Sequence, residues 1–256
     1  MGQLLNLVKK DLAEQWRTKK ILIIAVVLMF SAIASPILAK IMPEILKSVS
    51  TQGITITLPD PSYKDAIDQF IKNVSQIGLL VLVFVVASAM TDEKNKRTLE
   101  IVMTKPISRQ IFVLSKYVAY FISLAIIFTI SSLIFYQYSV DIFSEYSWNN
   151  FIIMSKCIFA FIIMVVSFTI MVSTLVKNSI VAGGIGFVFY LLFGTILSMI
   201  QVVKDYSPNI ILSNYQEILK SGYNDDLAKP LLVIVLVVIF SISISMLVFR
   251  HQEIEK

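Results

Sequence analysis

The chain has 256 residues, of which 57% are hydrophobic and only 15% are charged. A soluble domain averages about 25% charged residues. Here the apolar excess is gathered in long runs, which indicates a membrane protein rather than a soluble one. The net charge of +5 would suit a nucleic-acid partner, but its distribution along the chain favours membrane topology instead. The single cysteine, Cys157, excludes an internal disulfide.

The first 20 residues have the pattern of an amphipathic helix. Leu5, Val8, Leu12 and Trp16 fall at helical spacing, while the lysines and arginines lie off that stripe. Such a helix would lie in the membrane interface, attracted by anionic headgroups. The alternative is a basic leader that only sets the topology.

Six apolar runs are each near the roughly 20 residues that a helix needs to cross the hydrocarbon core. The predicted spans are Ile21–Ile41, Ile71–Met90, Ile111–Tyr136, Phe151–Val176, Ile180–Val203 and Leu231–Phe249. The first differs from a signal peptide because it continues past Pro36. The second is the weakest, since Lys72, Asn73 and Gln76 interrupt its first turns. Residues 21–256 are therefore expected to form one all-α transmembrane domain of six helices.

The distribution of lysine and arginine predicts the orientation. With six spans, both termini share one side with the 91–110 loop and the 177–179 turn. That side carries 14 of the 22 lysines and arginines but 7 of the 17 acids. The positive-inside rule places it in the cytoplasm, so we expect a multi-pass protein of the cell membrane with both termini cytoplasmic.

The outer segments are then residues 42–70, 137–150 and 204–229. The first, at about 30 residues, is too short for a domain of its own, and Ser62 is expected to cap a helix that begins at Tyr63. The last contains an apolar stripe too short to span the membrane, which predicts a re-entrant or interfacial outer helix, with a plain surface helix as the alternative. Its members are Ile210, Ile211, Leu212, Tyr215, Ile218 and Leu219.

Small and polar residues within the spans are expected to serve packing. Ser179 and Gly183, like Ala182 and Gly186, have the four-residue spacing that lets helices approach closely. Serine and threonine hydroxyls in membrane helices usually bond the carbonyl one turn back. No acid lies in the central part of a span, which argues against a proton- or sodium-coupled transporter.

The two lysines inside the spans, Lys116 and Lys156, each lie about five residues from a span end. At that depth a lysine can reach the membrane surface with its ammonium, so both are expected to snorkel.

The sequence lacks the residues that nucleotide binding, zinc binding and cysteine-based catalysis require. The sequence contains no G-x-x-x-x-G-K-[ST] phosphate-binding loop. With one histidine, His251, and one cysteine, neither a zinc site nor a Cys–His couple is expected. We therefore predict no catalytic, cofactor-binding or metal-binding residues. An intramembrane hydrolase is formally possible but unattractive, because neither lysine lies deep in a span.

The charged loop between the second and third spans is the most informative part of the chain. Thr91 can cap a short helix with Asp92 and Glu93 in its first turn. Lys94, Lys96 and Arg97 follow, then an apolar set formed by Leu99, Val102 and Met103; Pro106 ends the element and Ser108 can cap the third span. A solvated loop is the alternative, but the mixed charges beside an apolar face favour a docking helix.

This loop resembles the one between spans two and three of type-2 ATP-binding-cassette permeases, whose pattern runs roughly E-K-x-x-G-T-L-E, then P-[IV]-S-R and a lysine in the next helix. The matching residues are Glu93, Lys94, Thr98, Leu99, Glu100, Pro106, Ser108, Arg109 and Lys116. Arg97 stands where the family usually has glycine. The topology of the whole chain, with its amphipathic helix, six spans and outer helix, also fits the family.

The resemblance implies a cytoplasmic coupling helix that docks into a separate ATPase subunit, with contacts from Glu93, Lys94, Arg97, Thr98, Leu99, Glu100, Pro106, Ser108 and Arg109. It implies a homo- or heterodimeric permease, itself not an enzyme, whose partner ATPases bind ATP and Mg. The lack of a large external domain fits export, of a peptide, drug or lipid-like substrate, better than import. The alternative function is a membrane scaffold or sensor that recruits a cytoplasmic partner through the same basic loop.

Overall fold

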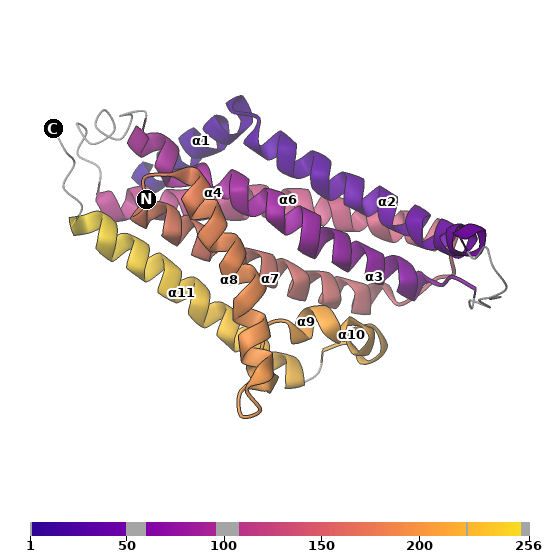
Figure 1. Ribbon diagram of the computed structural model, residues 1–256. Coiled ribbons are helices and arrows are strands. Elements are labelled where there is room, and N and C mark those ends of the chain that lie inside the picture. The colour runs from indigo at the N-terminus through magenta and orange to yellow at the C-terminus, as the bar shows by residue number, and fades with distance from the viewer. Residues whose placement is uncertain (1, 50–59, 96–107, 224, 252–256) are drawn as a thin grey trace.

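A computed structural model of the protein describes residues 2–49, 60–95, 108–223 and 225–251, all of them in helices, turns or short connections. Within these ranges there is no β-strand. The predicted all-α class is confirmed. The described part is a bundle of long helices with short helices at its two ends (Figure 1).

Among the described residues, six helical segments are long and apolar enough to cross a membrane, as the sequence predicted. The first is preceded by α1 (Gly2–Arg17). The six are α2 (Lys20–Val49), the continuous run of α3 (Tyr63–Asn73), η1 (Val74–Gly78) and α4 (Leu79–Asn95), then α6 (Arg109–Ile142), α7 (Trp148–Leu175), α8 (Ser179–Met199) and α11 (Ala228–His251).

The two ends of the bundle differ. The beginning of α1, the end of α4, the beginning of α6 and the end of α11 lie at one end, which we call the N-terminal face (Figure 1). The other end, the distal face, carries the start of α3, the start of α7 and the short outer helices. Placement of the start of α1 and the end of α11 at one end agrees with an even number of spans.

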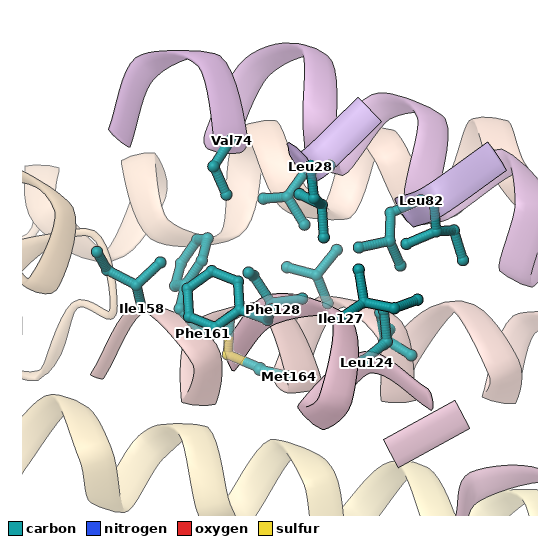
Figure 2. Packing of buried hydrophobic residues seen from close by; sticks show 14 of the residues in the cluster. Leu28, Val74, Leu82, Leu124, Ile127, Phe128, Ile158, Phe161 and Met164 are labelled. Carbon is teal, nitrogen blue, oxygen red and sulfur yellow. The ribbon is translucent and has the colours of Figure 1, made fainter. Parts of the chain in front are cut away.

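The core runs along α7, which packs against α4, α8 and α11, while α6 packs against α1 and α2. Figure 2 shows Leu28 and Val74 facing Phe128 and Phe161 across the bundle. Polar ties cross the same interior: the Tyr117 hydroxyl lies 2.7 Å from Ser245 Oγ and also donates toward backbone carbonyls of α7 and α11. A single side chain of α6 thus joins three spans.

Small residues of α8 allow a close approach to α4 and α7. A Cβ added at Gly186 would lie 2.6 Å from Thr169 Oγ1, and one at Gly183 would lie 2.6 Å from the Phe84 ring. At Gly184 nothing lies within 4 Å. The predicted packing role of this segment is confirmed. Hydroxyls also follow the prediction, as where Thr169 donates to the Val165 carbonyl one turn back.

Several predicted boundaries were wrong because helices continue beyond their apolar runs. Thr91 does not cap a new helix: it is buried inside α4, and its hydroxyl donates to the Ala87 carbonyl at 3.1 Å. The segment 137–142 is helical rather than a loop, and α2 continues to Val49 beyond the predicted Ile41, whereas the helix predicted from Tyr63 is confirmed. By contrast, α8 ends at Met199, before the predicted Val203. Charged residues extend α4 by one turn because each has a partner in a neighbouring helix, as described below.

The caps at the starts of two helices agree with the sequence. Ser62 caps α3, where its backbone N–H donates to Asp65 Oδ2 at 2.8 Å. Ser108 stands at the cap position of α6, although its side chain makes no capping hydrogen bond.

The outer stripe folds as two short helices, α9 (Ile210–Ser213) and α10 (Tyr215–Ser221), between the turns η2 (Lys204–Tyr206) and η3 (Asp225–Leu227). Ile211, Tyr215 and Ile218 are buried, and both helices pack against α7. Asn150 on α7 donates to the Leu219 carbonyl at 2.8 Å and so holds the end of α10. Whether this pair is re-entrant or interfacial stays a prediction.

Candidate functional site

A buried ion cluster lies at the N-terminal face, where the charged loop leaves and re-enters the bundle. Its centre is Lys116 on α6, whose side chain is 4% exposed. The ammonium lies 2.8 Å from Asp11 Oδ1 and 3.5 Å from Glu14 Oε2 on α1, and 2.5 Å from Glu93 Oε1 on α4. The prediction that Lys116 snorkels was wrong, because three carboxylates meet its ammonium inside the protein.

Lys10 provides a second positive charge to the same cluster. Its ammonium lies 2.7 Å from Glu93 Oε1, so both lysines share one carboxylate oxygen. Beneath them lies the ring of Phe112, with its centre 5.5 Å from Lys10 Nζ and 5.7 Å from Lys116 Nζ. Both distances are within the range of cation–π attraction. Charges buried this deeply are tolerated only when they are paired, as they are here.

The position of α1 explains how its acids reach the interior. The helix packs along α6 through Leu7, Val8, Asp11 and Gln15, which share one helical face. Ser115 donates to Asp11 Oδ2 at 2.6 Å, and Ser123 donates to Gln15 Oε1 at 2.7 Å. These bonds give one oxygen each of Asp11 and Gln15 a partner on α6. The face of α1 that meets the bundle is therefore half polar.

The apolar stripe predicted for α1 is divided between two environments. Val8 is buried and Leu12 is half-buried, whereas Leu5 and Trp16 are 59% and 71% exposed. The helix itself is present as predicted. Its position in a membrane interface stays a prediction, for which the exposed Leu5 and Trp16 are the available apolar side chains.

The residues just before the loop are also tied to other helices. Asp92 accepts from Lys20 of α2 at 2.8 Å. Lys94 donates to the Thr174 carbonyl in the last turn of α7 at 2.6 Å, and Asn95 donates to the Lys177 carbonyl at 3.2 Å. The last carbonyls of a helix lack partners within it and carry partial negative charge. Lys94 therefore caps the end of α7.

The first residue of α6 after the loop does the same for another helix. Arg109 Nη1 donates to the Arg250 carbonyl in the last turn of α11 at 3.0 Å. Both sides of the loop are thus attached to helix ends of the bundle by cationic side chains.

The residues predicted to contact an ATPase fall into two groups. Glu93, Lys94, Ser108 and Arg109 lie at the edges of the loop at the N-terminal face. The others lie outside the described residues: Arg97, Thr98, Leu99, Glu100 and Pro106. Glu93 is 2% exposed. It contacts Lys10 of α1 and Lys116 of α6, so a part in coupling would involve these two helices.

Sequence reasoning missed Lys10, Asp11 and Glu14 as members of a site. The sequence contained one signal of this site. Asp11 lies three residues after Val8 and four before Gln15, so the three share a helical face, and the third predicted span contains a lysine, Lys116. A pattern of this kind shows only that polar groups share a face, and it does not name their partner.

The three carboxylates have a spacing that could suit a cation. One oxygen from each of Asp11, Glu14 and Glu93 lies within 4.8 Å of the other two. The ammonium of Lys116 contacts all three, so it already supplies the positive charge that such a triad would take from an ion. The cluster offers charge pairing between helices.

Within the described residues, six helices long and apolar enough to cross a membrane define a polytopic helical membrane protein. The chain belongs to the ABC-2 family: the model described as "ABC-2 family transporter protein" matches residues 5–253. The match begins inside α1 and ends beyond α11, so it includes the whole ion cluster. The family predicted from the charged loop is confirmed.

A relative of similar length is the uncharacterized transmembrane protein YxlG of Bacillus subtilis (strain 168). It is 21% identical over 251 residues, which cover 94% of this chain and 96% of that protein. The similarity therefore extends over nearly the full length of both chains.

Proposed function

We propose that this chain is the permease subunit of an ATP-driven exporter. Membership of the ABC-2 family supports a transport role in the membrane and an association with an ABC ATPase. In the proposal ATP and Mg are bound by that separate subunit, because this sequence has no phosphate-binding loop. The permease works as a homo- or heterodimer and moves a peptide, drug or lipid-like substrate out of the cell.

The observation that carries the proposal is the attachment of the charged loop to the bundle. The last turn of α4 contacts α1 and α6 through Glu93, α2 through Asp92 and α7 through Lys94. On the other side of the loop, Arg109 contacts α11. A partner that pulls on the loop therefore pulls on most of the spans together. A solvated loop would not need such attachments.

Coupling follows from these contacts. An ATPase that closes on ATP has two states, and a loop seated in it has two positions. Motion of the α4 end would carry the Glu93 carboxylate with it, and with that carboxylate Lys10 and Lys116. Breaking the buried pairs of Lys116 with Asp11 and Glu93 would be costly, so α1, α4 and α6 would move as one unit.

The orientation is part of the proposal. The charge distribution puts the N-terminal face, with the loop and both termini, in the cytoplasm of a cell-membrane protein. In this orientation α1 lies in the inner interface, and Leu5 and Trp16 face lipid. The sequence offers no large external receptor domain on the distal face, which favours export.

Co-purification tests the proposal. The tagged full chain would be co-expressed with a candidate ABC ATPase and extracted in mild detergent. We expect the ATPase to be retained, and Leu99→Glu to release it because a charge replaces an apolar docking side chain. Tyr223→Glu, at an exposed position of the distal face, is the matched control and should retain it. If the ATPase were still retained by the Leu99→Glu variant, the loop would not be its docking site.

Binding of another cytoplasmic protein without any ATPase would instead favour the scaffold function.

A further inference from the structure

A second polar feature inside the spans lies far from the ion cluster. A groove of about 260 Å³ runs between α6 and α7 toward the distal face. Its walls are mostly apolar and include Phe128, Leu133 and Phe159. Four further side chains that line it can form hydrogen bonds: Ser132, Trp148, Ser155 and Lys156. The proposed coupling makes no use of this groove.

Lys156 is an exposed side chain inside a span, at a depth from which its ammonium can reach the headgroups. It follows Trp148, the first residue of α7, by eight residues, which is about 12 Å along a helix. Trp148 belongs to the aromatic residues that mark a membrane interface, so Lys156 lies within the apolar layer. Within the described part of the chain it has no ion pair or hydrogen bond. An ionisable group in this setting indicates a binding site for its partner.

The direction of the side chain limits where that partner can be. The Cα–Cβ bonds of a helix tilt toward its N-terminus. Since α7 begins at the distal face, Lys156 leans toward the headgroups of the leaflet on that face. A phosphate at the base of those headgroups is the nearest abundant anion.

Two hydroxyls in the groove are also unsatisfied. The Oγ atoms of Ser132 and Ser155 are buried and have no hydrogen-bond partner, and Ser132 is only 6% exposed. Other span hydroxyls, such as that of Ser35, donate to a carbonyl one turn back. Both oxygens are buried, so of these three donors the exposed Lys156 is the one that a bound anion can contact directly.

We propose that this groove binds an anionic phospholipid of the leaflet at the distal face. The phosphate pairs with the Lys156 ammonium, and one acyl chain follows the apolar wall formed by Phe128 and Phe159. Pockets that enclose a whole small ligand measure roughly 300–1,000 Å³. A groove of about 260 Å³ therefore suits one chain of a larger amphiphile. The site is independent of the exporter function.

The two tryptophans of the chain allow a direct test. In a Trp16→Phe background, Trp148 is the remaining fluorophore and lies in the groove. The full chain is reconstituted in phosphatidylcholine vesicles, and brominated phosphatidylglycerol or brominated phosphatidylcholine is added in increasing mole fraction. Bromine quenches the indole on contact. We expect half-maximal quenching at an about tenfold lower mole fraction of the anionic lipid, the ratio that one favourable ion pair of ordinary strength would give.

Matched variants separate this site from general attraction to charge. Lys156→Gln should abolish the preference for phosphatidylglycerol, whereas Lys40→Gln should keep it, because Lys40 is an exposed lysine of α2 outside the groove. Thr129→Phe, which fills the groove but keeps the charge, should weaken quenching by the anionic lipid. Equal quenching by both lipids would overturn the proposal. Absence of quenching by either would overturn it as well, since the groove would then be covered by another occupant such as a second copy of the chain.

Discussion

The Lys116 ammonium on α6 lies 2.8 Å from the Asp11 carboxylate on α1, so a buried ion pair attaches the N-terminal helix to the third span. The same ammonium contacts Glu93 at the end of the second span. Three segments that are distant in sequence therefore meet at one charge. Removal of this charge should therefore weaken the packing of all three segments against one another.

Lys116→Met should destabilise the protein strongly. The methionine keeps most of the volume but leaves buried carboxylates with less positive charge, and loss of one partner of a buried pair costs about 3–5 kcal/mol. Lys72→Met is the control, because the Lys72–Asp68 pair is exposed to solvent and should be worth less than about 1 kcal/mol. Denaturant titration in mild detergent measures both. Equal midpoints for the two variants would show that the cluster is not a buried unit.

A double-mutant cycle measures the attachment of α1 itself. Asp11→Asn and Lys116→Met each remove one side of the pair, and residues in direct contact show interaction energies of about 0.5–3 kcal/mol. We expect the double variant to lose less stability than the sum of the single variants. Strict additivity would mean that α1 is not held by this pair, and that the helix is attached through its other contacts, such as the one between Gln15 and Ser123.

The spans could be predicted from the sequence, but the site could be predicted only in part. A run of apolar residues near 20 in length has one physical solution in a membrane, so α2 or α11 follow directly from composition. The ion cluster joins three segments that are far apart in the sequence, and no periodic pattern of residues relates them to one another. The spacing of Asp11 shows that it shares a helical face with Val8 and Gln15, but not that α6 offers Ser115 and Lys116 to it.

The end of α4 shows the same limit in another form. Thr91 followed by two acids is a good helix start by local rules. The structure continues the existing helix instead, because Asp92 meets Lys20 and Lys94 meets the end of α7. Local propensity does not include such partners, and tertiary contacts override it here.

The glycines of α8 give a graded test of helix packing. Gly186→Ala should destabilise by about 1–3 kcal/mol, since the new methyl would meet Thr169 and Val83 in a tightly packed contact. Gly183→Ala should cost less, because the Phe84 ring that it meets is 41% exposed and can shift. Gly184→Ala meets nothing and should be neutral or stabilise by up to about 1 kcal/mol through helix propensity. Thermal unfolding in detergent ranks the three, and a different order would refute this packing.

Cysteine labelling tests the predicted orientation. In a Cys157→Ser background, Lys9→Cys and Tyr223→Cys place one exposed thiol at each face of the bundle. A membrane-impermeant maleimide should label Tyr223→Cys in intact cells and Lys9→Cys only after permeabilisation. The reverse pattern would contradict the positive-inside assignment and would place the charged loop outside the cell, where no ATPase could reach it.

Lys94→Met should separate coupling from docking. The Lys94 ammonium donates to the last carbonyls of α7 at 2.6 Å and 3.4 Å, and a hydrogen bond to a charged group contributes about 1.5–3 kcal/mol. The apolar loop residues Leu99, Val102 and Met103, which we expect to face the ATPase, are unchanged in this variant. The ATPase should therefore still co-purify, while motion of the loop reaches α7 less effectively. We expect hydrolysis by the reconstituted complex to lose its stimulation by substrate. Lys9→Met, at an exposed position of α1, is the control and should keep full stimulation. If Lys94→Met also kept it, the attachment to α7 would have no part in coupling, and the contacts of Glu93, Asp92 and Arg109 would carry the motion.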